Sequence, residues 1–442
     1  MNIGFIGLGK LGLPCAAAIS VKANKKIFGY DHNKKIKKYI NTNSVPYVEK
    51  DVEDFLSKSN IEFLDSIDDV VKNSDTIFIA VQTPHDPMFE GITPIPEERS
   101  DFDYSYLKSA VLNVASFLEI NKNKKVNLVI ISTVLPGTVN EHILPIIKNV
   151  KSRINLVYNP YFIAMGTTIE DFLNPEFILL GSAWGEADQI ESFYRTFLSA
   201  PVKRVSIESA ELAKVSYNTF IGMKIIFANA LAEITEATGG NVDEVTDVLS
   251  SATKRIISPA YMKAGMGDGG GCHPRDQIAM SWLAKKINMS FDIFEFISKA
   301  RDSQTRRHAE ILHNMQNVTH KGSEVIILGE SYKKNIGLTV GSPSKLLQFY
   351  LDELNVKYRV IDPFMSDEKI TFDDRKIFFV ATPHDVFKNL SMPMRSQVID
   401  PWGDSTTPQY GVMGANLGRG RFWYRDPLEV ESVLEKIEKG LL

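Results

Sequence analysis

The sequence is poor in cysteine, with only Cys15 and Cys272 among its 442 residues. Two cysteines are too few for the disulfide framework of a small secreted domain, so we expect a chain that works in a reducing cytoplasm. Long hydrophobic runs are also missing, because no stretch approaches the roughly 18 apolar residues of a membrane-spanning helix. The opening stretch, MNIGFIGLGKLG, has no basic segment ahead of an apolar one and predicts a strand instead of a signal peptide. We therefore expect no insertion into a membrane.

An excess of positive charge is missing too. The chain has 50 Lys and Arg residues against 54 Asp and Glu residues, which gives a formal net charge of −4. This balance gives no reason to expect a nucleic acid as a partner. The length allows two or three domains, and the sequence contains neither an internal repeat nor a low-complexity segment.

What the sequence does have is a glycine turn near its beginning. The stretch NIGFIGLGKLGLPCAAAIS reads as a short apolar strand, a G-x-G-x-x-G turn and a helix of small residues. The glycines are Gly7, Gly9 and Gly12, with Lys10 and Leu11 between the last two. In a dinucleotide-binding turn the first glycine permits the tight turn, the second lets a pyrophosphate approach the backbone, and the third packs helix against strand.

Asp31 ends the next predicted strand, nineteen residues after Gly12. An acidic side chain at this place accepts hydrogen bonds from the ribose hydroxyls of NAD and repels the 2′-phosphate of NADP. The sequence therefore predicts NAD as the cofactor, bound by the glycine turn and Asp31. Two alternatives stay open: a glycine turn without a ligand, and NADP, which four nearby lysines would suit (Lys34, Lys35, Lys37 and Lys38).

Two further apolar strands end in polar residues. DTIFIAVQTPHDP runs into Thr83 and Pro84, and NLVIISTVLPGTV runs into Ser132 and Thr133. Because the carboxyl ends of strands in an open parallel sheet face the ligand crevice, we expect these four residues to contact the cofactor. The alternative is that the threonines only cap their loops.

From about residue 206 the pattern becomes helical, and one face of the helix is polar. Glu211, Lys214 and Asn218 are three and four residues apart and therefore share a face. Their apolar neighbours predict a helix with little exposed surface, in which a lysine and an asparagine need polar partners or a ligand. We expect a functional role for Lys214 and Asn218, with a solvated charged face as the alternative.

The stretch MGDGGGCHPRDQIAMSWL surrounds Cys272 with glycines and continues into a helix predicted to start near Pro274. A thiol just before a helix N-terminus, in a loop open to ligands, has a lowered pKa, which makes Cys272 a candidate nucleophile. Asp276 lies in the first turn of the predicted helix, where the helix dipole favours an acidic residue. Cys15 lies among alanines and fits an inert buried thiol instead.

The last third repeats the order of strand, glycine turn, helix and strand in SEVIILGESYKKNIGLTVGSPSKLLQFYLDELNVKYRVIDP. KIFFVATPHDVF and QVIDPWG supply later strands. We therefore predict an α/β fold with two doubly wound Rossmann-like domains joined by a central helical region. The predicted boundaries are 1–204 for the NAD-binding domain, 205–312 for the central helical domain and 313–442 for the C-terminal nucleotide-sugar-binding domain.

Together these blocks resemble the UDP-glucose/GDP-mannose dehydrogenase family from residue 1 to about residue 403. The most specific segments are GFIGLGKLGLP, STVLPGT, NPYFIAMGTTIEDFLNPEFILLG, AELAKVSYNTF, GGGCHPRD and GESYKKN followed by SPS. Members oxidise C6 of a nucleotide sugar from the alcohol to the carboxylate, using two NAD and a catalytic cysteine. The resemblance implies a UDP- or GDP-hexose as substrate, a place in polysaccharide biosynthesis and a homodimer built on the central helices.

The resemblance also assigns roles position by position. Cys272 matches the nucleophile, Asp276 the acid–base group and Thr133 a water-binding threonine, while Lys214 and Asn218 match the pair that polarises the reacting oxygen. Arg255 matches an arginine that reaches a neighbouring subunit's site, and Lys333 a lysine that contacts the nucleotide. The substrate-binding positions are Tyr161, Phe162, Lys214, Asn218, Arg255, Tyr261, Lys263, Gly269 and Lys333. The glycines before Cys272 are expected to let the loop close over a sugar diphosphate without side-chain bulk.

The chain departs from the family at several places. Members commonly read N-P-E-F-L-R-E-G where residues 159–166 read NPYFIAMG, so both glutamates and the arginine are missing. One of these glutamates usually helps to organise the hydrolytic water. Two alternatives to the complete oxidation follow, namely an enzyme that stops at the aldehyde and a regulator that binds a nucleotide sugar without turnover. The presence of a nucleophile together with its base and oxyanion partners favours the enzyme.

Overall fold

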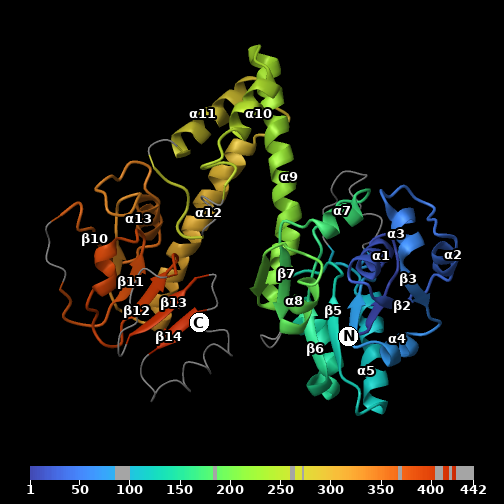
Figure 1. Cartoon of the computed structure of the whole chain (residues 1–442). Helices are drawn as coiled ribbons and strands as arrows, with labels where there is room; N and C mark the ends of the chain where they lie inside the picture. Colours follow the sequence, from blue (N-terminus) through green and yellow to red (C-terminus); the bar gives the residue numbers. More distant parts are fainter. Residues whose placement is uncertain are drawn as a thin grey trace. The chain divides into compact units, whose positions relative to one another are not determined.

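The computed structural model describes residues 1–84, 100–182, 187–258, 264–270, 273–366, 371–403, 412–417 and 421–424. The chain divides into two compact units, Met1–Met223 and Lys224–Leu442, and each is described by itself (Figure 1). The division falls within helix α9 (Ile207–Thr238), and the bounds of the three domains drawn from the sequence stay a prediction. In the part of the chain described, no helix combines the length and the hydropathy needed to cross a bilayer.

The first unit is built on an eight-stranded sheet in the order β3-β2-β1-β4-β5-β6-β7-β8. Paired strands run parallel except β6 and β7, which are antiparallel. Strands β1, β4 and β5 are buried at every residue, as expected for uninterrupted apolar runs covered on both faces. The bounds are β1 Ile3–Ile6, β2 Lys26–Tyr30, β3 Asn60–Phe63, β4 Thr76–Ile79, β5 Val126–Ile130, β6 Ile154–Tyr158, β7 Ile178–Ser182 and β8 Val202–Val205.

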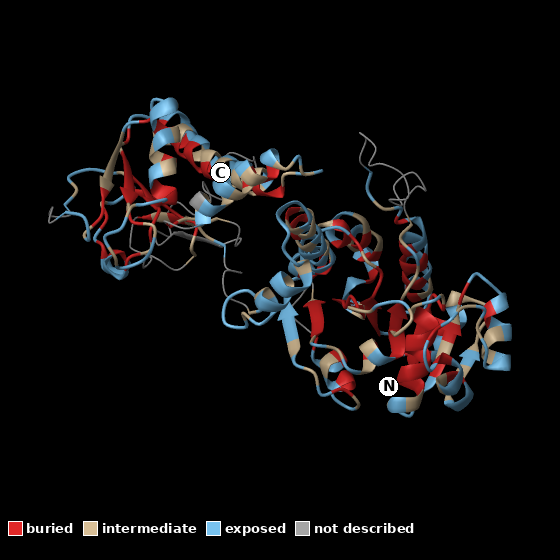
Figure 2. Cartoon of the chain, turned by 90° about the horizontal axis from the view of Figure 1, so that it is seen from above, coloured by how far each residue is buried: buried red, intermediate tan, exposed pale blue. Residues whose placement is uncertain are grey.

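Helices cover both faces of this sheet. One face forms a core with α1, α3, α7 and α8, and the other with α4, α5, α6 and the first turn of α9. Cys15 of α1 is buried in the first core, and burial raises the pKa of its thiol, as the prediction of an inert cysteine requires. Figure 2 shows the buried strands lying between partly exposed helices. The helices are α1 Gly12–Lys22, α2 Lys35–Thr42, α3 Val52–Lys58, α4 Ile67–Asn73, α5 Ser105–Ile120, the π-helix η2 Val139–Ile143, α6 Leu144–Ile147, the 3-10 helix η3 Lys148–Arg153, α7 Thr168–Leu173 and α8 Asp188–Tyr194.

The second unit contains a six-stranded sheet in the order β10-β9-β11-β12-β13-β14, in which only the last pair is antiparallel among the described strands. Helices α12 and α13 cover one face, and the short helix η5 covers the other. The strands are β9 Val325–Leu328, β10 Tyr358–Ile361, β11 Ile377–Val380, β12 Gln397–Asp400, β13 Met413–Asn416 and β14 Arg421–Tyr424. The helices are α10 Val242–Ser250, α11 His273–Lys286, α12 Ile293–Asn314, η4 Met315–Thr319, α13 Pro343–Glu353 and η5 Asp385–Asn389.

The predicted fold class is confirmed, since two doubly wound sheets are separated in the sequence by the helices α9 to α12. In the first unit the strands β3-β2-β1-β4-β5-β6 follow the order of a dinucleotide-binding Rossmann fold. The chain passes from β1 to β2 on one side and later returns to β4 on the other. Ligands of such sheets bind at this point, outside the carboxyl ends of the strands.

Candidate active site

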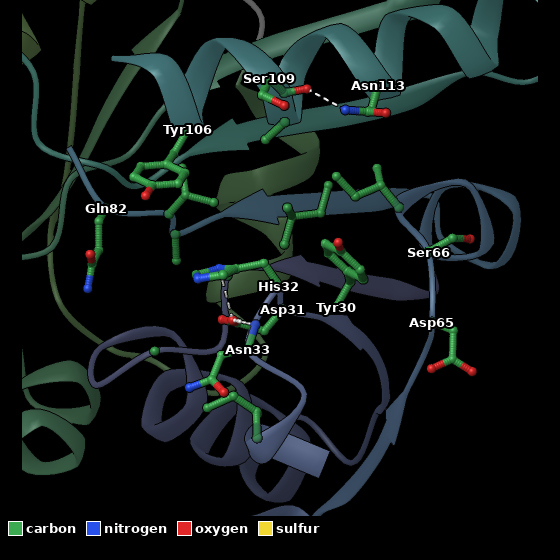
Figure 3. Close-up of a pocket in the computed structure, with 18 of the residues that line it drawn as sticks. Tyr30, Asp31, His32, Asn33, Asp65, Ser66, Gln82, Tyr106, Ser109 and Asn113 are labelled. Atoms are coloured by element: carbon green, nitrogen blue, oxygen red, sulfur yellow. Dashed lines mark hydrogen bonds and ion pairs between the residues drawn. The ribbon is translucent and has the colours of Figure 1, made fainter. Parts of the chain in front are cut away.

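A cavity of about 630 Å³ lies at the carboxyl ends of β1, β2 and β4, where ligands of this fold bind (Figure 3). Sequence reasoning missed several of its residues, although their positions directly after strands are a signal that could have found His32 and Gln82. Besides the glycine turn, the polar lining consists of Tyr30 at the end of β2, Asp31, His32 and Asn33 after it, Asp65 and Ser66 before α4, Asp68 in α4, Gln82 after β4, and Tyr106, Ser109 and Asn113 on α5.

The three glycines of the turn have different surroundings. Gly7 has a φ of +94°, and a Cβ there would lie 2.7 Å from the carbonyl oxygen of Ala80. A Cβ on Gly12 would overlap the carbonyl oxygen of Gly7, because α1 begins directly against the turn. A Cβ on Gly9 would have no atom within 4 Å, and this residue lines the cavity. The room beside Gly9 fits a pyrophosphate that approaches the backbone.

The N-terminus of α1 is suited to an anion. Leu11 is its N-cap residue and makes no side-chain hydrogen bond to the helix, and the first turn contains no acidic residue. The ammonium of Lys10 lies 5.8 Å from the centre of the Tyr47 ring. The N–H groups and the dipole of such a helix end favour the negative charge of a phosphate.

Asp31 connects the glycine turn to the cavity. Its Oδ2 accepts the N–H of Leu8 at 2.7 Å, and its Oδ1 accepts the N–H of Asn33 at 2.8 Å. The Nδ1 of His32 lies 3.3 Å from the same Oδ1 (Figure 3). The turn therefore fixes the carboxylate beside the cavity, where the ribose hydroxyls of a dinucleotide would lie.

The polar residues after β4 and β5 bond to each other's loops. The Thr83 hydroxyl donates to the carbonyl oxygen of Thr133 at 2.7 Å, and the Ser132 hydroxyl donates to that of Val81 at 2.6 Å. Pro84 and Thr133 are half-buried in the same loops. The hydroxyls of Thr83 and Ser132 thus fasten the loops together, and contact of the four residues with the cofactor stays a prediction.

Lys214 of α9 is a buried cation near the carboxyl end of β6. Its Nζ donates to the carbonyl oxygen of Tyr161 at 2.8 Å and lies 4.9 Å from the centre of the Phe162 ring. Among the described residues, no carboxylate lies within the 4.0 Å that defines an ion pair with it. Burial therefore lowers the pKa of the ammonium. Such an amine can stabilise negative charge on a substrate oxygen more strongly than a solvated one.

The residues around Lys214 differ in what they offer a ligand. Asn218, one turn further along α9, is exposed, and Phe162 is half-buried. Tyr161 was expected to bind substrate, but its side chain lies in the core, where its hydroxyl bonds to that of Tyr194 at 3.0 Å. Only the main chain of Tyr161 therefore reaches the neighbourhood of Lys214.

The expectation that α9 has little exposed surface is wrong. Among the described residues, its members of the core clusters lie toward its two ends, Ile207 and Ala210 at one end and Ala230 and Ile234 at the other. Between these ends the large apolar side chains are from about a third to more than half exposed, namely Leu212, Tyr217, Phe220, Ile221, Met223, Ile225, Ile226 and Phe227.

In the second unit the glycine-rich loop packs tightly against protein. A Cβ on Gly265 would overlap the ring of Trp402, and one on Gly269 would lie 2.6 Å from Cδ of Pro343. Gly270 has a φ of +97°, in the left-handed region that favours glycine. These glycines permit close packing against protein, while closure of the loop over a sugar diphosphate stays a prediction.

Other predicted residues of the second unit can be placed only in part. Cys272, Tyr261 and Lys263 lie outside the described residues. Arg255 is exposed in the segment after α10. Asp276 is exposed in the first turn of α11, which begins at His273, beside the predicted start.

The second sheet has a turn that corresponds to the first. Asp362 follows β10 as Asp31 follows β2, and it accepts the N–H groups of Glu330 and Ser331, each at 2.8 Å. Ser331 occupies the position of Gly9 and is 1% exposed, with its hydroxyl bonded to the same carboxylate at 2.7 Å. A side chain therefore fills, in the second turn, the place that the first turn leaves for a pyrophosphate.

Lys333 lies in a loop that Asn335 fastens to the residues after β11. Asn335, at a φ of +60°, donates its main-chain N–H to Nδ1 of His384 at 2.8 Å. Its side-chain amide donates to the carboxylate of Asp385 and accepts the main-chain N–H of Asp385. Because Nδ1 accepts, the ring proton of the buried His384 lies on Nε2, 3.2 Å from Asp362. Lys333 itself is exposed on this fixed loop.

Comparisons with known proteins agree with this geometry. The model of the NAD-binding domain of the UDP-glucose/GDP-mannose dehydrogenase family matches residues 1–198, and that of the family's central domain matches residues 208–303. A GDP-mannose 6-dehydrogenase of Pseudomonas aeruginosa is 26% identical over 394 residues, covering 87% of this chain and 86% of that one. A UDP-glucose 6-dehydrogenase of Bacillus subtilis is 29% identical over 377 residues, covering 83% and 77%. The crystal structure of a ternary complex of GDP-mannose dehydrogenase from Pseudomonas aeruginosa superimposes with a TM-score of 0.80 at 24% identity, covering 94% and 99%.

Proposed function

Because the chain belongs to the UDP-glucose/GDP-mannose dehydrogenase family of NAD-dependent oxidoreductases, we propose that it oxidises C6 of a UDP- or GDP-hexose to the carboxylate. The observation that carries this proposal is the placement of two features at the carboxyl ends of the first sheet's strands. There the cavity beside Gly9 and Asp31 and the buried ammonium of Lys214 lie at the carboxyl ends of strands of the same sheet. A cofactor site and a desolvated cation on one edge suit the removal of hydride from an alcohol.

NAD fits the residues of the first unit. The room beside Gly9 and the N-terminus of α1 would hold the pyrophosphate, and Asp31 would accept the ribose hydroxyls. When bound, NAD accepts the hydride that leaves C6.

The first oxidation uses the polar face of α9. Lys214 and Asn218 stabilise the oxygen on C6 while the alcohol loses a proton and a hydride and becomes an aldehyde. The thiol of Cys272 then adds to the aldehyde, with its sulfur on C6 and its proton on the oxygen, which gives a thiohemiacetal. Loss of a second hydride and of the hydroxyl proton leaves a thioester on Cys272.

Water then releases the acid. Asp276 takes a proton from a water molecule held by Thr133, the C–S bond breaks, and the thiol of Cys272 is restored. One sugar, two NAD and one water are consumed for each acid formed. The missing glutamates slow this step without abolishing it, since one positioned polar group is worth roughly 10²–10³ in rate.

The family resemblance assigns further substrate contacts to Phe162 and the main chain of Tyr161, and to Gly269, Tyr261 and Lys263. Lys333 would bind the nucleotide. Arg255 would reach the site of a second copy, which makes the protein a homodimer with an isologous interface.

The test is the number of NADH formed for each nucleotide sugar, followed by absorbance over a panel of UDP- and GDP-hexoses. We expect two NADH for each sugar, and an adduct on the Cys272 peptide by mass spectrometry after quenching. Cys272→Ser is expected to permit the first oxidation and to block release of the acid. One NADH for each sugar, free aldehyde in a trapping assay and a fully active Cys272→Ala would contradict the proposal and favour an enzyme that stops at the aldehyde.

A further inference from the structure

The first turns of α9 contain a carboxylate that the chemistry above does not use. Glu211 is fully buried and lies one turn before Lys214. Its Oε2 accepts the N–H of Gly137 at 2.6 Å, and its Oε1 accepts the N–H of Val139 at 2.9 Å. Burial raises the pKa of Glu211, while these two hydrogen bonds oppose the rise. A buried carboxylate is costly unless it is bonded in this way, so both oxygens have a defined task.

That task concerns the loop between β5 and η2, which carries Thr133. The beginning of the loop is fastened to the loop after β4 by the hydroxyls of Thr83 and Ser132. Its far end reaches Glu211, where Gly137 has a φ of +93° and η2 begins at Val139. The carboxylate of Glu211 therefore joins the far end of the loop to α9.

Glu211 and Lys214 fasten α9 to two different loops. Glu211 holds the loop after β5, and Lys214 holds the loop after β6 through the carbonyl oxygen of Tyr161. β5 and β6 are neighbours in the sheet, and in the described part of the chain no ion pair joins the two charged residues. These two contacts, one turn of α9 apart, add to the bonds of Thr83 and Ser132 in setting the position of Thr133 relative to Lys214.

We propose that Glu211 is a positioning residue, which fixes the Thr133 loop against α9 so that the water held by Thr133 can reach the bound intermediate. The inference rests on the role given to Thr133 in the proposed function. A glutamine at 211 would place an amide NH₂, a donor, opposite a main-chain N–H, so one of the two bonds would be lost. The loop would then be free to move relative to Lys214.

The experiment compares Glu211→Gln with Glu208→Gln. Glu208 is a matched control, since it lies on the same helix, is exposed, and accepts a hydrogen bond from the side chain of Asn140 at 2.6 Å. For Glu211→Gln we expect amide exchange in residues 132–138 to rise by about tenfold or more, with the other peptides of the first unit unchanged. We expect kcat to fall on the order of 10²-fold, as for a misplaced reacting group, with KM for NAD changed by less than about threefold. Glu208→Gln should resemble the wild type in all three measurements.

A double-mutant cycle separates this inference from the proposed function. If Glu211 acts through the loop, Glu211→Gln should add little to the loss caused by Thr133→Val. Unchanged exchange in the loop, a kcat within about twofold of the wild type, or fully additive losses would overturn the role of Glu211. A Thr133→Val enzyme that turns over at the wild-type rate would instead count against the role of Thr133, while the exchange measurement still decides that of Glu211. If Glu211→Gln does not fold, Glu211→Asp replaces it, with the same expected direction, because its shorter side chain cannot hold both N–H groups.

Discussion

At the residue scale, substitutions in the glycine turn can change the affinity for NAD with or without changing the stability of the fold. Gly9→Ala adds a methyl group where no atom lies within 4 Å, so thermal unfolding is expected to stay that of the wild type. The same methyl group would crowd a pyrophosphate, and overpacking of about 1–3 kcal/mol corresponds to roughly a 5- to 150-fold loss of NAD affinity. Gly12→Ala overlaps the carbonyl oxygen of Gly7 and should lower both the Tm and the affinity. Equal NAD affinities of Gly9→Ala and the wild type, measured by titration, would show that the cofactor lies elsewhere.

Lys214 links activity to a pH dependence of stability. Burial lowers its pKa in the folded state below the 10.5 of an exposed lysine. At low pH both states carry the proton, and the fold bears the cost of a buried charge. As the pH rises past the folded pKa, the folded state loses the proton first and this cost is relieved, up to the unfolded pKa. We therefore expect the Tm of the wild type to rise relative to that of Lys214→Met as the pH approaches 10.5, and kcat of the variant to fall by about 10²–10³. A Tm difference that does not change with pH would contradict the burial of a charged Lys214.

How far single residues were predictable depends on how local their surroundings are. Gly12 and Asp31 contact the glycine turn itself, at Gly7 and at Leu8, so spacing alone indicated their geometry. Tyr161 and Ser132 could not be placed in this way. Their hydroxyls bond to α8 and to the loop after β4, which are distant in sequence, and only the packed sheet brings these partners within reach.

At the scale of elements, the middle of α9 predicts assembly. Large apolar side chains from residue 212 to residue 227 are exposed in the single chain, and such patches usually mark interfaces. We expect a dimer in sedimentation at micromolar concentration, and dissociation by Ile225→Glu, because a buried unpaired charge is costly. Val318→Glu is the control, since Val318 is 73% exposed but lies in η4, away from this surface in the sequence. A wild-type monomer, or an Ile225→Glu dimer as stable as the control, would refute an interface on α9.

The order of elements could be predicted from periodicity and glycine turns, but the reason for the glycines near Cys272 could not. Gly269 packs against Pro343 at the start of α13, and Gly265 packs against Trp402 after β12. Their spacing suited a ligand loop equally well, because bare backbone permits close approach by either a phosphate or a protein side chain. Only the packed structure shows the contacts with Pro343 and Trp402.

At the scale of the whole molecule, the two corresponding turns are unequal. Both begin with a glycine and are held by an aspartate after the next strand, but Gly9 borders open space whereas Ser331 is buried. We therefore expect calorimetric titration to give one NAD for each chain. Ser331→Gly should not add a second site, since Asp362 would still hold the N–H groups of the turn. Two equivalents of NAD bound by the wild type would contradict this asymmetry.

The single open turn has a consequence for the order of events in time. An oxidation that removes four electrons through one dinucleotide cavity has to exchange its cofactor halfway, while the half-oxidised sugar stays attached. A covalent bond to Cys272 would keep that sugar in place during the exchange. The ratio of NAD to NADH around the enzyme would then determine how quickly a captured sugar goes on to the acid, so the flux would respond to the redox state of the surroundings as well as to the supply of sugar.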